Sequence, residues 1–207
     1  MTDQPTLKNA YALQSVDDVK DLYRDWAETY DMGFSMSQGY QIPREVALAF
    51  VCAGGGGPVL GVGAGTGLVG EQLQTLGIND IDGVDLSAEM LKVAEIKGHY
   101  RDLLNADVTQ PLPNNPRYAG IVSAGTFTLG HVGPEGVIAL LAAARAKALF
   151  VISVNARHFE RAGFAAMLDT LKGQITDVSF KDVRIYDDRA DEAHRDELAR
   201  LLIFRTV

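Results

Sequence analysis

Glycine stands at every second position of the stretch VLGVGAGTG, residues 59–67, which opens on an apolar run. Glycine weakens a strand because it adds conformational entropy to the unfolded chain and packs no side chain. The run therefore predicts a short strand followed by a loop whose backbone comes close to a ligand, with a helix beginning near Leu68. Gly61 differs from Gly63, Gly65 and Gly67, because it lies inside the predicted strand.

Beyond Pro58, short apolar runs alternate with helical patterns. We expect strands over 59–62, 80–84, 103–106, 119–123, 149–154, 178–186 and 201–207, and helices over 68–76, 88–97, 135–147 and 159–171. This alternation predicts an α/β fold, a Rossmann-like doubly wound seven-stranded sheet with helices on both faces. The sheet is expected to be mostly parallel, with an antiparallel last strand, because a charged stretch separates the last two runs.

The first 52 residues have helical patterns instead. Ser15 is a predicted N-cap for a helix whose apolar residues recur at helical spacing as far as Tyr30, and a second helix is predicted from Pro43 to Cys52. Four consecutive glycines separate this segment, residues 1–52, from the predicted sheet core, 58–207. We expect one domain over 1–207.

The charge balance restricts the partners of the chain. Of its 207 residues, 19 are Lys or Arg and 27 are Asp or Glu, a formal net charge of -8, so no nucleic acid partner is predicted. No apolar signal segment begins the sequence, and its longest apolar run is interrupted by Arg145 and Lys147, so no membrane segment is expected. The single cysteine, Cys52, is expected to be buried and indicates a reducing, cytoplasmic compartment.

Three kinds of site fit a glycine loop. A P-loop needs Lys and Ser/Thr at the helix start, where Leu68 and Val69 stand. A dinucleotide fingerprint fits only residues 65–70, two positions too far from the strand end. The third kind is a loop with two acids, and both are present: Asp85 and Asp107 each end a predicted strand. A carboxylate at the first place can accept hydrogen bonds from ribose hydroxyls, and one at the second from an adenine amino group.

With these motifs the chain resembles class I S-adenosylmethionine-dependent methyltransferases, most closely the Williams–Beuren-region methyltransferase-like group. The resemblance rests on residues 26–31, 59–67, 81–91, 106–109 and 123–134, and it covers about residues 25–205. It implies S-adenosylmethionine as methyl donor and S-adenosylhomocysteine as product. No Cys/His spacing typical of a metal site occurs, so no metal is expected.

The resemblance also implies which residues bind the donor. It implies that the loop residues Gly63, Ala64, Gly65, Gly67 and Leu68 contact the methionyl part and that Asp85 binds the ribose. Leu86 and Met90 would lie against the adenine faces, and Asp107 and Val108 would contact the adenine edge. Ser123 and Ala124 would line the donor site, and Tyr30 would belong to an N-terminal lid.

Two positions depart from the family pattern. Members usually carry an acid at Gly61, which helps hold the ammonium group of the donor, and commonly an Asp at Ala119. The missing acid predicts weaker donor binding, and Gly61→Asp is expected to strengthen it.

Methyl transfer from a sulfonium is an in-line displacement, which an enzyme accelerates chiefly by alignment. His131, in the loop after the fourth predicted strand, is the candidate catalytic base, and helix capping is its alternative role. We predict a methyltransferase acting on a small-molecule acceptor, as a monomer or homodimer. The alternatives are a protein of this fold that binds the donor without turnover, because of Gly61 and Ala119, and a dinucleotide oxidoreductase, which the glycine register and Asp107 disfavour.

Overall fold

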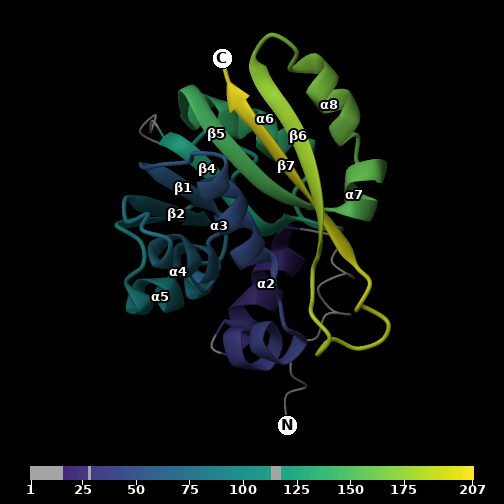
Figure 1. Ribbon diagram of the computed structural model, residues 1–207. Helices are drawn as coiled ribbons and strands as arrows, with labels where there is room; N and C mark the ends of the chain where they lie inside the picture. Colours follow the sequence, from purple (N-terminus) through teal and green to yellow (C-terminus); the bar gives the residue numbers. More distant parts are fainter. Residues whose placement is uncertain (1–15, 28, 113–117) are drawn as a thin grey trace.

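The computed structural model describes residues 16–27, 29–112 and 118–207 (Figure 1); the predicted N-cap Ser15 lies outside these ranges. Seven strands form one sheet in the order β3-β2-β1-β4-β5-β7-β6. Strand β7 runs antiparallel to β5 and β6, and the other neighbouring pairs are parallel. The predicted sheet with an antiparallel last strand is confirmed.

The strands are β1 (Val59–Val62), β2 (Ile81–Asp85), β3 (Asp102–Asn105), β4 (Tyr118–Phe127), β5 (Ala144–Asn155), β6 (Ile175–Arg184) and β7 (Leu198–Thr206). The helices are α2 (Val16–Trp26), the π-helix η1 (Tyr30–Met36), α3 (Ile42–Cys52), α4 (Leu68–Thr75), α5 (Ala88–Lys97), α6 (Pro134–Leu140), the 3₁₀ turn η2 (Leu141–Ala143), α7 (Ala156–Arg161) and α8 (Phe164–Thr170). No described helix is long and apolar enough to cross a membrane.

Helices cover both faces of the sheet, each over its own apolar core. Residues of α3, α4 and α5 pack on one face, together with Val122 of β4. Residues of α6, α7 and α8 pack on the other, together with Ile121. These two neighbours point to opposite faces because successive side chains of a strand alternate. The doubly wound arrangement follows from burial on both sides.

The strand order reverses beside β1. The chain goes outward from β1 to β2 and β3 and then crosses to β4 on the other side of β1. In open sheets of this kind, ligands bind beyond the carboxyl ends of the strands at the point of reversal. The loops after β1, β2, β3 and β4 therefore meet at this edge, and Figure 1 shows α2 lying near it.

Two predicted helices differ from their patterns. The helix predicted over 135–147 stops before Ala144, which pairs with Tyr118 and begins β5, so strand pairing prevails over the local helical pattern. The helix predicted over 159–171 is divided into α7 and α8 at Gly163, whose φ of +86° breaks the helical course.

The N-terminal predictions also need correction. The first helix ends at Trp26, and Tyr30 belongs to the separate π-helix η1. Cys52 ends α3 as predicted but is exposed, not buried.

We expect Gly120→Ala to destabilise the fold. An added methyl group would lie 2.3 Å from Cζ of Phe50, which joins α3 to β4, and such overpacking costs about 1–3 kcal/mol. Urea unfolding measures the loss. Gly56→Ala is the control, because Gly56 has no heavy atom within 4 Å of its added carbon; an equal loss there would contradict the packing explanation.

Candidate functional site

A cavity of about 370 Å³ opens at the edge where the strand order reverses. Predicted site residues that line it are Tyr30, Gly63, Ala64, Gly65, Leu68, Asp85, Leu86, Met90, Asp107, Val108, Ala124 and His131. Residues from the N-terminal segment and from the loops after β1, β2, β3 and β4 thus meet in one place. Gly61, Gly67 and Ser123 are not among its lining residues.

The loop after β1 requires glycine for two different reasons. Gly63 and Gly65 have φ angles of +63° and +53°, a region that side chains disfavour. In addition, a Cβ on Gly63 would lie 1.8 Å from Oγ1 of Thr126, which leaves no room for one. The backbone can therefore approach a ligand closely, as the sequence predicts.

Asp85 holds this loop. Its Oδ2 accepts a hydrogen bond from the N–H of Gly65 at 2.8 Å, and its Oδ1 accepts one from Ser87 at 2.9 Å. Burial raises the pKa of Asp85, and the backbone N–H groups of Ser87, Gly65 and Leu86 lower it by less. A carboxylate has about four acceptor sites, so Asp85 retains capacity for a hydroxyl donor of a ligand.

Asp107 is held by its own turn. Its Oδ1 accepts hydrogen bonds from the N–H of Thr109 at 2.9 Å and from the Thr109 hydroxyl at 2.8 Å. These bonds fix the carboxyl group at the cavity wall. Its other oxygen, Oδ2, can accept from an amino group that enters the cavity.

Ser123 and Gly67 support the site from outside the cavity. Ser123 is fully buried, and its hydroxyl donates to the carbonyl of Val62 at 2.9 Å, which joins β4 to the end of β1. Gly67 is the N-cap of α4, with a left-handed φ of +96°. Both residues fix the course of the loop.

The described part of residues 16–41, here called the lid, covers the cavity with aromatic side chains. Tyr23, Tyr30 and Tyr40 line it. Asp31 fastens one side of the lid: its Oδ1 accepts a hydrogen bond from Thr66 at 2.5 Å, and its Oδ2 pairs with Lys97 at the end of α5. The glycine loop and the lid are thus in direct contact.

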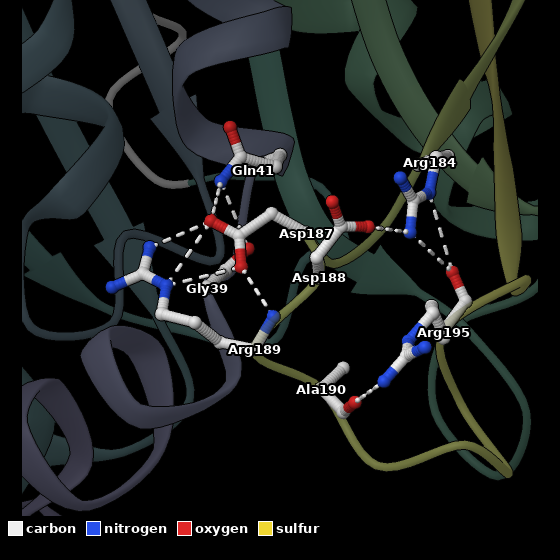
Figure 2. Close-up of polar contacts among 8 residues, drawn as sticks. All are labelled: Gly39, Gln41, Arg184, Asp187, Asp188, Arg189, Ala190 and Arg195. Carbon is white, nitrogen blue, oxygen red and sulfur yellow. Dashed lines mark hydrogen bonds and ion pairs between the residues drawn. The ribbon is translucent and has the colours of Figure 1, made fainter.

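The loop between β6 and β7 fastens the other side (Figure 2). Asp187 accepts hydrogen bonds from Gln41 and from Arg189, and its own N–H donates to the carbonyl of Gly39 at 2.9 Å. Arg189 also donates to the carbonyl of Met36. Its guanidinium group lowers the pKa of Asp187 to about 2, so this carboxylate stays charged at neutral pH.

The ring of His131 has a defined tautomer. Its Nδ1 lies 3.0 Å from the carbonyl of Leu129, which can only accept, so Nδ1 carries the hydrogen. Nε2 then presents its lone pair, to which the hydroxyl of Tyr23 donates at 3.1 Å. Burial, the largest effect, lowers the pKa of His131, and the nearby His158 lowers it further. His131 is therefore a neutral acceptor of protons.

A second, smaller cavity of about 60 Å³ lies beside the first. The two share five lining residues: Tyr23, Tyr30, Tyr40, Gly125 and His131. The second is walled mainly by aromatic and aliphatic side chains, among them Trp26, Phe34, Phe127 and Tyr186. Of the described residues that line it, none is Asp, Glu, Lys or Arg.

Gly61 lies beneath the loop, where the ring of Tyr100 fills the adjacent space. A Cβ on Gly61 would lie 3.2 Å from Cε1 and 3.3 Å from the hydroxyl oxygen of Tyr100. The expectation that Gly61→Asp strengthens donor binding ignores this ring. An aspartate there would have to displace Tyr100.

Sequence reasoning missed several residues of the site. Tyr23 has the spacing of a packed helix face, and only the fold shows that it meets His131. Thr66 and Asp31 are joined by a hydrogen bond in the fold but lie 35 positions apart in the sequence. For Tyr100 the available signal was the excess of glycine at positions 61, 67, 70 and 83, which gives no indication of what fills the space.

Residues 59–149 match the model of a protein family described as "Methyltransferase domain". A search of curated protein sequences gives no match. Among the described residues, no three His, Cys, Asp or Glu side chains are grouped so that they could hold a metal ion.

Solved structures of methyltransferases share the fold over most of their length. N-methyltransferase NodS from Bradyrhizobium japonicum, in complex with S-adenosylhomocysteine, is 14% identical, with a TM-score of 0.64 over 88% of this chain and 96% of that one. The CcbJ methyltransferase from Streptomyces caelestis is 19% identical, with a TM-score of 0.63 over 89% and 98%. A TehB-like SAM-dependent methyltransferase from Corynebacterium glutamicum is 15% identical, with a TM-score of 0.63 over 89% and 98%.

At such low identities the likeness to these structures is one of fold. The family match adds the segment that holds β1, the glycine loop, Asp85 and Asp107. Residues 59–149 therefore match a methyltransferase domain model, within a chain that shares the fold of these solved methyltransferases.

Proposed function

We propose that the chain is an S-adenosylmethionine-dependent methyltransferase that acts on a small-molecule acceptor. The observation that carries the proposal is the meeting of the glycine loop, Asp85 and Asp107 around one cavity at the point of strand reversal. The methyltransferase domain match and the fold of the relatives support it.

In this proposal each part of the donor has its own partners. Asp85 accepts hydrogen bonds from the ribose hydroxyls, and Asp107 with the Val108 backbone contacts the adenine edge. Leu86 and Met90 lie against the adenine faces. Backbone of the glycine loop, with Ala64, Leu68, Ala124 and Tyr30, surrounds the amino-acid end. Ser123, Gly61 and Gly67 act from outside the cavity.

The charges of the cavity favour this ligand over a dinucleotide. No lysine or arginine is among the described residues that line it, and its two acids are Asp85 and Asp107. A pyrophosphate there would have no cationic partner and would face two carboxylates. A nucleoside that carries an amino acid and no phosphate meets neither difficulty.

His131 and Tyr23 lie where the two cavities join. Bound S-adenosylmethionine supplies an activated methyl group. An acceptor hydroxyl or amine must lose a proton as it is methylated, and the neutral Nε2 of His131 can accept this proton, either directly or through the Tyr23 hydroxyl.

The second cavity is the proposed place of the acceptor group. Its 60 Å³ and its aromatic walls suit a compact, apolar part of a molecule. Burying an unpaired charge there would be costly, because the wall offers no oppositely charged side chain. We therefore propose an acceptor that is uncharged next to its nucleophilic atom.

The remaining assignments rest on the sequence. They are membership of the Williams–Beuren-region methyltransferase-like group, a single domain over 1–207, a cytoplasmic location, and a monomer or homodimer without nucleic acid or membrane partners. A donor-binding protein of this fold without turnover is the alternative, and methyl transfer distinguishes it from an enzyme.

Calorimetric titration tests donor binding. We expect S-adenosylmethionine and S-adenosylhomocysteine to bind and NAD not to bind. Asp85→Ala should abolish measurable binding, because it removes both the ribose acceptor and the hydrogen bond that fixes Gly65. Asp80→Ala is the matched control, since Asp80 precedes β2 and does not line the cavity. Binding of NAD alone would contradict the proposed function.

Methyl transfer is tested by measuring the S-adenosylhomocysteine that forms with each member of a panel of compact acceptors. The panel compares alcohols, phenols and amines with carboxylates. We expect uncharged acceptors to be methylated, and His131→Gln to lower kcat about 10²–10⁴-fold with unchanged donor affinity. Because burial lowers the pKa of His131, activity should persist as the pH falls through 6.5 and disappear at lower pH. Unaltered turnover in His131→Gln would remove it from the mechanism.

A further inference from the structure

The ring of Tyr100 lies in a slot that four glycines leave open. Gly61 and Gly83 are register partners on β1 and β2, and a Cβ on them would lie 3.2 and 3.1 Å from the ring. At the start of α4, a Cβ on Gly67 or Gly70 would lie 3.5 or 2.7 Å from it. The ring is therefore enclosed between the sheet and the first turn of α4.

Most of these four positions have glycine because a side chain would have no room there. Gly61, Gly70 and Gly83 do not have left-handed φ angles, so their backbone would accept other residues. What a side chain at these positions meets is Tyr100, together with Leu103 and Ala64 in the case of Gly83. The four positions and the tyrosine form one packing unit beneath the loop.

The hydroxyl of Tyr100 is buried, and its hydrogen has no acceptor among the described residues. Burial is the main cause that raises the pKa of the phenol; the nearby backbone N–H of Gly70 lowers it by less, and the charge of Asp85 raises it further. The hydroxyl therefore keeps its proton and lies within electrostatic reach of Asp85. A buried hydroxyl whose hydrogen has no acceptor costs stability, so its retention calls for an acceptor in another state of the protein.

We propose that Tyr100 is a positioning residue for the donor: its ring supports the glycine loop from beneath, and its hydroxyl is the neutral polar anchor for the amino-acid end of the donor. This inference rests on the proposed function. Tyr100 does not line the cavity, so it acts through the loop, or through a water beneath it. It occupies the space that an acid at position 61 would need.

Tyr100→Phe tests the hydroxyl separately from the ring. Calorimetry should show S-adenosylhomocysteine binding about five- to tenfold more weakly, the loss of about one hydrogen bond. Binding of 5′-methylthioadenosine, which has the same nucleoside and no amino-acid end, should be unchanged. The Tm should change little, because the hydrogen of this hydroxyl has no acceptor to lose.

Tyr118→Phe is the matched control. It also removes a buried tyrosine hydroxyl, which donates to Asp82 at 3.0 Å, away from the cavity. We expect a lower Tm and unchanged affinity for both ligands.

The outcomes separate the two proposals. A wild-type protein that binds neither ligand refutes the proposed function, and this inference with it. If the wild type binds both and Tyr100→Phe changes neither affinity, or weakens both alike, the anchor is refuted and the proposed function stands.

Gly61→Asp tests the ring. Overpacking against Tyr100 should lower the Tm by about 4–10 °C and weaken S-adenosylhomocysteine binding. In a Tyr100→Leu variant, which has space at the ring, adding Gly61→Asp should lower the Tm by less than it does in the wild type. In a Phe180→Ala variant, on the edge strand β6, the effects of the two substitutions on the Tm should add. Tighter binding by a folded Gly61→Asp protein would overturn the inference.

Discussion

The candidate site depends on the carboxylate of Asp85. It accepts hydrogen bonds from Gly65 and Ser87, so it fixes the loop after β1 and the start of α5 to the end of β2. These bonds require β1 and β2 to be parallel, because antiparallel neighbours would place the two strand ends at opposite edges. The cavity, the loop geometry and the position of the lid therefore all depend on the strand order of the sheet.

The lid is held by charges outside the cavity and closes it with neutral groups. Asp31 of the lid pairs with Lys97 on one side. On the other, the ion pair of Asp187 and Arg189 within the β6–β7 loop makes hydrogen bonds with Gln41 and Met36 of the lid. Partly exposed ion pairs of this kind contribute little stability each, but they fix where the segment lies. What the lid turns inward are tyrosines. Among the described residues that line the first cavity, the charged ones are therefore Asp85 and Asp107, a pattern that suits the positively charged donor proposed above.

The parts of the site that follow one another in sequence were predictable. The glycine run, Asp85 and Asp107 are each local patterns at strand ends, and parallel strand order brings local patterns together. Contacts made across the fold were not predictable. Tyr23 meets His131 over 108 positions, and Ala144 becomes a strand because Tyr118 pairs with it. Such pairings depend on tertiary packing, which a single sequence does not encode in its periodicity.

The sequence and the structure lead to different expectations for Gly61. The family pattern has an acid at this position, so from the sequence the glycine predicts weaker donor binding. In the fold the same glycine is one of four that make room for Tyr100, whose hydroxyl oxygen would lie 3.3 Å from a Cβ at position 61. A neutral phenol costs less to bury than a carboxylate, and it leaves Asp85 as the nearby charge. On the proposal that Tyr100 anchors the donor, the glycine at 61 and this ring belong together, so a strand residue and a distant aromatic ring must be altered together to place an acid at 61.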